Sequence, residues 1–114
     1  MTMVGDRPID RVIAEMTRRI VERFDPLQVI LFGSQARGDA GPDSDVDLLV
    51  VFPRVENSRL MAVAILSELR GLGVAKDVVV TTPEEIQAWG KLIGTVLEPA
   101  LREGRILYDR DLAA

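Results

Sequence analysis

Two aspartates in this sequence have the type and spacing to do chemistry. Asp45 and Asp47 stand two residues apart at the start of an apolar run, VDLLVVF. In an extended strand alternate side chains point to the same face, so the two carboxylates would lie side by side. Such like charges repel each other unless a cation lies between them, and carboxylate oxygens suit Mg²⁺ or Mn²⁺. The pair predicts a divalent metal site, although an Asp-x-Asp at a strand start can also simply be solvated in a loop.

A glycine–serine pair lies ten residues before the aspartates. Gly33 and Ser34 end another apolar run, LQVILF. Glycine lets backbone N–H groups approach an anion, and a following helix N-terminus adds donors for phosphate. The Ser34 hydroxyl can donate to the same oxygens. The pair alone could be a plain turn with Ser34 as a helix cap, but its combination with the aspartates, between two apolar strands, favours phosphate and metal binding.

The composition narrows the chemistry further. The 114 residues include no cysteine and no histidine, which excludes thiolate or histidine-ligated metal sites and Ser-His-Asp hydrolysis. Carboxylates, hydroxyls, Lys, Arg or an oxygen-bound metal must therefore carry any reaction. The formal net charge of -4 argues against broad binding to nucleic acid, which needs a basic face.

The elements that must position these residues follow from periodicity and from turn residues. They predict an α/β (α+β) fold, one small mixed sheet of three to four strands flanked by helices. A dinucleotide-binding fold is disfavoured because no Gly-x-Gly-x-x-Gly turn is present. Helices are expected at about 8–24, 34–37, 59–70 and from 83 to about 103, and strands at 27–32, 46–52, 77–81 and, at an edge, 105–108.

Three local expectations accompany this pattern. One face of the third helix should consist of Leu60, Val63, Ala64 and Leu66, with Leu69 as a further candidate, and should be buried. Thr82 should cap the fourth helix. The last helical region should be interrupted at Gly90 and Gly94 and bent at Pro99. Three further residues are expected to have structural roles only. Asp39 and Asp43 should form turns, and Trp89 should lie in the core or at an interface.

The length fits a single domain, residues 1–114. The N-terminus lacks the basic and apolar pattern of a signal peptide, and the apolar run Leu48–Phe52 is too short to span a bilayer. We therefore expect a cytoplasmic protein that does not interact with membranes.

One stretch of the chain resembles a known family. Gly33-Ser34-Gln35-Ala36-Arg37-Gly38, followed by Ser44-Asp45-Val46-Asp47-Leu48, is similar to the signature of minimal nucleotidyltransferase (MNT) domains. These belong to the polymerase-beta-like nucleotidyltransferase superfamily. The resemblance extends in length and element order over almost the whole chain, and it implies the polymerase-beta-like nucleotidyltransferase fold.

The resemblance also implies roles for individual residues. Asp45 and Asp47 would bind two Mg²⁺ ions, with Mn²⁺ as a substitute, and Gly33 and Ser34 would hold a nucleoside triphosphate. The family has a third carboxylate on a later strand, as metal ligand or general base. Asp77 fits this position, or it is a polar residue at a strand edge.

Arg37 stands one helical turn beyond Ser34. At that position its guanidinium could reach the triphosphate and offset developing charge. The alternative is an ordinary solvated arginine on the surface.

The reaction implied is transfer of a nucleoside monophosphate, by default AMP from ATP, to a hydroxyl with release of pyrophosphate. A chain of this length has no room for a second substrate-binding lobe, so the acceptor should either dock on an exposed face or be presented by another protein. MNT proteins pair with helical HEPN toxins, which makes a tyrosine of such a toxin the expected acceptor and this chain an antitoxin. Two alternatives remain open: a non-catalytic antitoxin that neutralises its partner by docking, and a Mg-nucleotide sensor.

Overall fold

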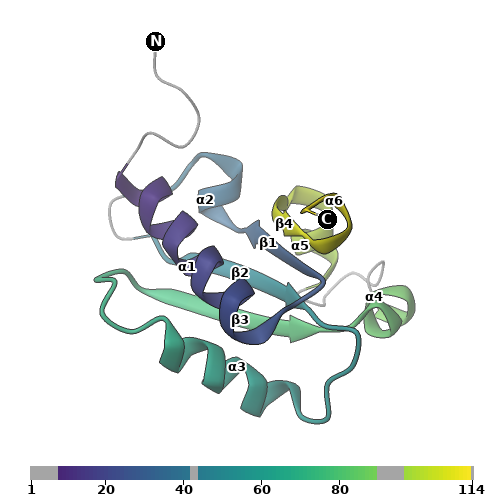
Figure 1. Ribbon diagram of the computed structural model, residues 1–114. Helices are drawn as coiled ribbons and strands as arrows, with labels where there is room; N and C mark the ends of the chain where they lie inside the picture. Colours follow the sequence, from purple (N-terminus) through teal and green to yellow (C-terminus); the bar gives the residue numbers. More distant parts are fainter. Residues whose placement is uncertain (1–7, 42–43, 90–96, 114) are drawn as a thin grey trace.

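The computed structural model describes residues 8–41, 44–89 and 97–113, which form one sheet with helices on both faces (Figure 1). In chain order the elements are α1 (Pro8–Phe24), β1 (Gln28–Phe32), α2 (Ser34–Arg37), β2 (Val46–Val51), α3 (Ser58–Glu68), β3 (Lys76–Thr81), α4 (Pro83–Trp89), α5 (Leu97–Glu103), β4 (Arg105–Asp109) and α6 (Arg110–Ala113).

The four strands are arranged in the order β3-β2-β1-β4. β1 runs antiparallel to both of its neighbours, β2 and β4, whereas β2 and β3 are parallel. The sheet is therefore mixed, as the sequence predicts, and β4 is an edge strand, also as predicted. The two central strands are buried almost throughout.

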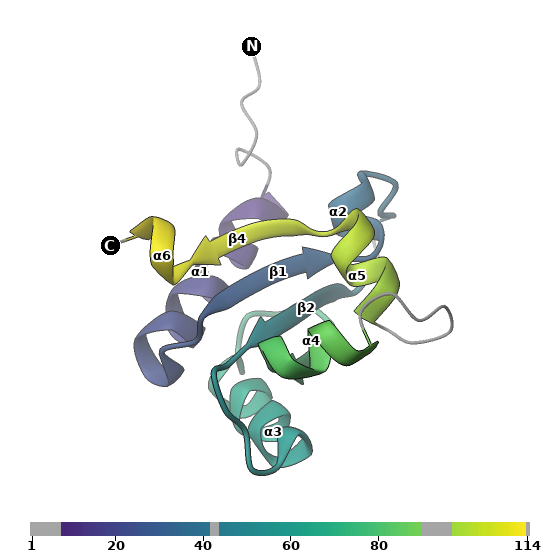
Figure 2. The same cartoon turned by 90° about the vertical axis from the view of Figure 1, so that its right-hand side faces the viewer.

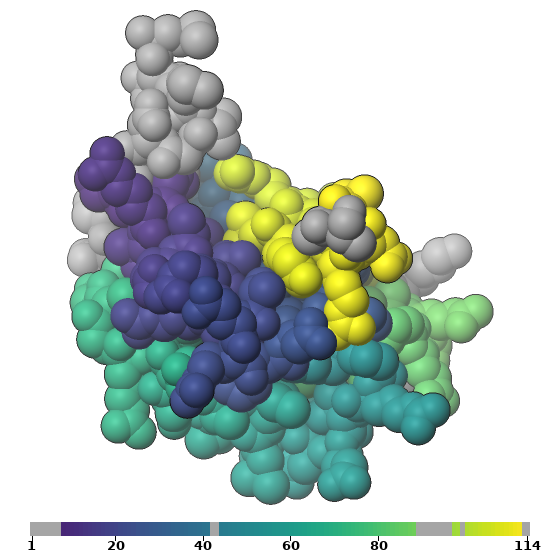
Figure 3. Space-filling view, viewed as in Figure 1, coloured from purple at the N-terminus to yellow at the C-terminus, as the bar shows by residue number. Residues whose placement is uncertain are grey.

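One face of the sheet packs against α1 and α3, and alternate strand residues supply it. The core on this face consists of Ile13, Met16, Ile20, Val29, Leu31, Val46, Leu48, Val50, Phe52, Ile65, Leu69, Val78 and Val80. In the space-filling view of this side (Figure 3), side chains of α1 and of the α3 region spread over the strands. Burial of this apolar surface is the main force that holds the layer together.

The opposite face packs against α5 and the start of α4, which Figure 2 shows in front of the sheet. Its smaller core consists of Ile30, Phe32, Leu49, Val51, Leu97 and Ala100. Because strand side chains alternate, this is also the face that receives residues Asp45, Asp47 and Asp77. The sheet is thus the middle of three layers, with the aspartates on the α5 side.

The helix and strand predictions are confirmed to within two residues except at two places. The buried face predicted for α3 is confirmed only in part: Leu69 is buried and Leu66 packs against the core. Leu60 and Val63 are instead 64% and 54% exposed, and the buried Ile65 was not predicted. The helix is apolar on nearly every side, so periodicity alone could not distinguish the packed row from the exposed one.

The region after β3 is the second difference. The predicted helical region contains two helices among the described residues, α4 and α5. Pro99 lies in the first turn of α5, where proline is tolerated, and not at a bend within a longer helix. Gly90 and Gly94, the expected interruptions, lie outside the described residues. The Thr82 cap is confirmed, since its Oγ1 accepts a hydrogen bond from Glu85 N at 3.2 Å. None of the described helices is long and apolar enough to cross a membrane.

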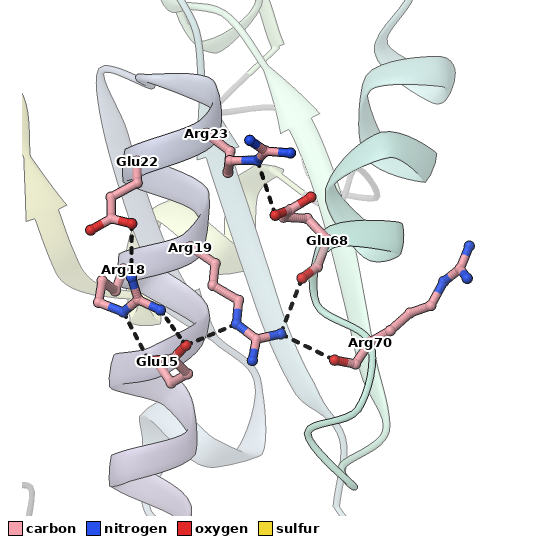
Figure 4. A network of polar contacts seen from close by, with 7 residues as sticks. All are labelled: Glu15, Arg18, Arg19, Glu22, Arg23, Glu68 and Arg70. Atoms are coloured by element: carbon pink, nitrogen blue, oxygen red, sulfur yellow. Dashed lines mark hydrogen bonds and ion pairs between the residues drawn. The ribbon is translucent and has the colours of Figure 1, made fainter.

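A polar network joins α1 to the end of α3 (Figure 4). Arg19 Nη1 donates to the carbonyl oxygens of Glu68 and Arg70, at 3.2 and 3.1 Å, where helix carbonyls have no partner within the helix. Arg23 Nε lies 3.0 Å from the Glu68 carboxylate. Glu15 accepts from Arg18 and Arg19, and these hydrogen bonds lower the pKa of Glu15 to about 2. The two helices on this face are therefore fixed to each other as well as to the sheet.

Candidate active site

The register of the strands brings the predicted site residues to one end of the sheet. Phe32, the last residue of β1, lies opposite Asp47 on β2, and Asp47 lies opposite Asp77 on β3. Gly33 follows Phe32 directly, so it turns away from the sheet beside Asp47. Asp45, two residues before Asp47, precedes the first residue of β2.

The contact between Gly33 and Asp47 is the tightest feature of this end. Gly33 has φ +74°, a backbone conformation that residues with a Cβ rarely adopt. A Cβ added there would overlap the carboxylate oxygen Oδ2 of Asp47. Glycine is therefore required twice, once by the turn and once by the carboxylate packed against its Cα.

Electrostatics show that Asp45 and Asp77 act on Asp47. The pKa of Asp47 is raised, first because the half-buried carboxyl loses solvation and then because the charges of Asp77 and Asp45 oppose its ionisation. The positive charge of Arg37 acts in the opposite direction. Asp45 and Asp77 are exposed, so Asp47 is the inner member of the three.

Ser34 is half-buried and begins α2, with Gly33 in the N-cap position. Its interpretation as a helix cap is therefore wrong: the capping residue is the glycine before it. The α2 helix is a single turn, closed by hydrogen bonds from Ala36 N and Arg37 N to Gly33 O, each 3.1 Å.

Arg37 is not a freely solvated arginine. Its Nε lies 3.2 Å from Asp39 Oδ2 and its Nη1 lies 3.2 Å from Glu103 Oε2, at the end of α5. These two hydrogen bonds raise the pKa of Arg37, that to Asp39 more than that to Glu103. Asp39 is thus an ion-pair partner as well as a turn residue, whereas Asp43 lies outside the described residues.

The sequence did not indicate the structural roles of two residues of the motif, Gln35 and Ser44. Gln35 is only 4% exposed, and its Nε2 makes a long hydrogen bond of 3.5 Å to Ser44 O. The Ser44 hydroxyl accepts from Gly41 N at 2.8 Å, and Ser44 N donates to Gly41 O at 3.2 Å. A polar residue in a helix of only four residues gives no periodic signal of burial, so the sequence did not indicate that Gln35 is buried.

The donors at this end of the sheet suit a hard cation. Carboxylate oxygens are the ligands of Mg²⁺ or Mn²⁺, and Mg²⁺ is commonly held by one or two carboxylates together with substrate phosphates. In the part of the chain that the structure describes, no three acidic side chains form a ready-made metal cluster. Asp47, Asp45 and Asp77 could therefore hold such an ion only together with oxygens from a bound molecule, such as those of a phosphate.

Comparison with known proteins places this arrangement in a family. The model of the nucleotidyltransferase domain family matches residues 13–102, which include Gly33 and all three aspartates. A solved structure of a candidate minimal nucleotidyltransferase is 30% identical, covers 89% of this chain and 97% of its own, and superimposes with a TM-score of 0.59. The chain is a minimal nucleotidyltransferase.

Named relatives of this nucleotidyltransferase are protein adenylyltransferases. MJ1305 of Methanocaldococcus jannaschii, a candidate protein adenylyltransferase, is 27% identical over 95% of this chain and 77% of its own length. The protein adenylyltransferase MntA of Thermococcus cleftensis is 36% identical over 55 residues, which are 48% of this chain and 56% of MntA. A candidate nucleotidyltransferase of Sulfolobus solfataricus, 24% identical with a TM-score of 0.61 over 89% of this chain and 80% of its own, shares the fold.

Replacing Gly33 by alanine should separate the two demands on this glycine. We expect Gly33→Ala to cost about 1–2 kcal/mol for its positive φ and also to displace Asp47. Gly38→Ala is the matched control, because Gly38 has φ +85° with nothing within 4 Å of an added Cβ. Urea denaturation should show the larger loss for Gly33→Ala, and nucleotidyl transfer should fall in that variant alone. Equal effects in both variants would contradict the role of the Asp47 contact.

Neutralising Asp47 should relieve repulsion. Because the pKa of Asp47 is raised in the folded chain, the unfolded chain releases that proton first as the pH rises, and stability falls. In metal-free buffer the free energy of unfolding of Asp47→Asn should equal or exceed that of the wild type. The gain should grow from about pH 4 upward. It should stay below about 1 kcal/mol because water screens the site. Asp111→Asn, at the far end of the sheet, should show no such gain. A loss of stability in Asp47→Asn that grows with pH would refute this sign.

Proposed function

We propose that this nucleotidyltransferase transfers AMP from ATP to a tyrosine hydroxyl of a helical HEPN-type toxin and thereby acts as its antitoxin in the cytoplasm. The observation that carries the proposal is the packing of Asp47 against Gly33, with the charges of Asp45 and Asp77 acting on the same carboxyl. A cluster of negative charge built so close to a glycine turn costs stability, and a metal-bound triphosphate is a ligand that would offset that cost.

The residues at the end of β1 are proposed to bind the triphosphate. Gly33 keeps the turn free of side-chain atoms, and the Ser34 hydroxyl can donate to a phosphate oxygen. Arg37 lies close enough to act on the charge of Asp47, so among the described residues its guanidinium is the cation best placed to neutralise phosphate. These residues would contact the phosphates and do not define which base the nucleotide carries. ATP is proposed because the named relatives are adenylyltransferases.

The metal ligands are proposed to be Asp45, Asp47 and Asp77, for two Mg²⁺ ions or Mn²⁺ in their place. When bound, the ions would supply positive charge to the triphosphate and align it with the acceptor. Asp47, as the inner and partly desolvated carboxylate, would be the central ligand. One oxygen of Asp77 accepts a hydrogen bond from Val78 N at 3.0 Å, which helps to hold that carboxylate.

In the proposed reaction the tyrosine oxygen attacks the α-phosphorus of ATP. A new phosphorus–oxygen bond joins AMP to the tyrosine, the bond between the α-phosphorus and the bridging oxygen breaks, and pyrophosphate leaves. The phenolic proton passes to a carboxylate, for which Asp77 is proposed because it is exposed. The chain forms no covalent intermediate, so its contribution is positioning and charge stabilisation.

The acceptor is proposed from the activities for which two relatives are named and from the complex in which a structural neighbour was solved. MntA and MJ1305 are named for transfer of adenylyl groups to proteins, which supports a protein acceptor here. A toxin–antitoxin structure with AMP-PNP has this fold, at 19% identity and a TM-score of 0.53 over 88% of this chain and 76% of its own. Together with the MNT signature, these names favour a toxin that presents its hydroxyl to the exposed end of the sheet.

Label transfer from α-³²P-ATP tests the proposal. The chain is incubated with Mg²⁺ and the helical protein encoded beside it, and tyrosine-linked label is measured. Asp45→Asn/Asp47→Asn should lower transfer by about 100-fold or more, the range expected when transition-state charge stabilisation is lost. Asp111→Asn should transfer normally.

Two outcomes would contradict the proposal. Label transfer that is unaffected by the double substitution would remove the carboxylates from the reaction. Full neutralisation of the toxin by the double variant would show that docking alone carries the antitoxin effect.

A further inference from the structure

The ion pair between Arg37 and Glu103 has a geometry that bears on nucleotide binding. A guanidinium has two edges that can each grip an anion through two nitrogens, Nε with Nη2 and Nη1 with Nη2. In Arg37, Asp39 holds the first edge through Nε and Glu103 holds the second through Nη1, both at 3.2 Å. Each edge is thus already engaged by one carboxylate.

We infer that Glu103 competes with the triphosphate for Arg37, so that nucleotide binding exchanges the Glu103 carboxylate for a phosphate and releases α5 from α2. This inference rests on the proposed binding of a nucleoside triphosphate. Either edge includes Nε or Nη1, and each of these nitrogens already has a carboxylate partner. A phosphate that grips two nitrogens of one edge therefore competes with one of the two carboxylates.

Glu103 is the carboxylate that can leave at lower cost. Its other oxygen, Oε1, lies 3.2 Å from Arg102 Nη1, so the charge keeps a partner after Arg37 is withdrawn. Asp39 is two residues from Arg37 in the chain and stays close to it whatever its side chain contacts. The long-range pair, which spans 66 residues, is therefore the one that responds to the ligand.

The position of Glu103 connects this exchange to the junction between α5 and β4. Glu103 is the last residue of α5, and Gly104 joins that helix to β4. A Cβ at Gly104 would overlap Ala100 O and Ile30 Cγ2, so the junction is packed tightly against β1. Glu103 extends from this fixed junction to α2 and so acts as a positioning residue for Arg37; loss of the pair frees the last turn of α5.

Isothermal titration with AMP-PNP and Mg²⁺ tests the competition. Glu103→Gln keeps the shape of the side chain and removes its charge, and it should lower the Kd about two- to fivefold, the worth of an exposed ion pair. Glu22→Gln, which removes an exposed pair with Arg18 on α1, should leave the Kd unchanged. In an Arg37→Ala background the effect of Glu103→Gln should vanish, and adenosine, which lacks phosphates, should bind all variants alike.

Hydrogen exchange of the wild type gives a second measurement that needs no substitution. AMP-PNP with Mg²⁺ should speed exchange of amides in residues 100–104, against the usual slowing on ligand binding. Slower or unchanged exchange there, an unchanged or higher Kd for Glu103→Gln, or a gain that persists in Arg37→Ala would each overturn the inference. Failure of label transfer with this affinity pattern intact would remove only the proposed acceptor, whereas a wild type that does not bind AMP-PNP would overturn both.

Discussion

The contact between the Asp47 carboxylate and the Cα of Gly33 is the constraint on which the rest of the site depends. It requires β1 to end opposite Asp47, a glycine with positive φ at the next position, and a carboxylate that tolerates partial burial. The antiparallel register of β1 and β2 meets the first requirement, and the parallel register of β2 and β3 adds Asp77 from the other side. One packing contact thus fixes a turn, a strand pair and a cluster of negative charge.

The two apolar layers make that cluster tolerable. Helices α1 and α3 cover one face of the sheet and α5 covers the other, so the strands are fixed by buried residues rather than by the polar end. The end of the sheet can then hold mutually repelling carboxylates, as active sites commonly do at the expense of stability. The Arg37 pair with Glu103 links that end to α5, so the layer that supports the fold is also the one that we propose responds to a ligand.

Much of this could be predicted from sequence, and the failures have physical causes. The apolar runs and the Gly-Ser and Asp-x-Asp spacing predicted the central strands and brought Gly33, Asp45 and Asp47 together, because strand alternation and register follow from local pattern. The face of α3 was predicted only in part, since a helix with apolar residues on nearly every side gives no clear periodic signal. Glu103 and the buried Gln35 were missed because contacts between residues far apart in sequence, and burial within a one-turn helix, leave no mark on local composition.

The pKa of Asp47 tests the central claim most directly. Carboxyl carbon shifts from ¹³C-labelled aspartate can be followed by NMR through a pH titration, first without metal and then with Mg²⁺ and AMP-PNP. A raised pKa in metal-free buffer is predicted from burial and from the charges of Asp77 and Asp45, and a bound cation should lower it below its usual value. An Asp47 pKa that does not respond to Mg²⁺ and nucleotide would contradict the assignment of this end of the sheet as the metal and triphosphate site.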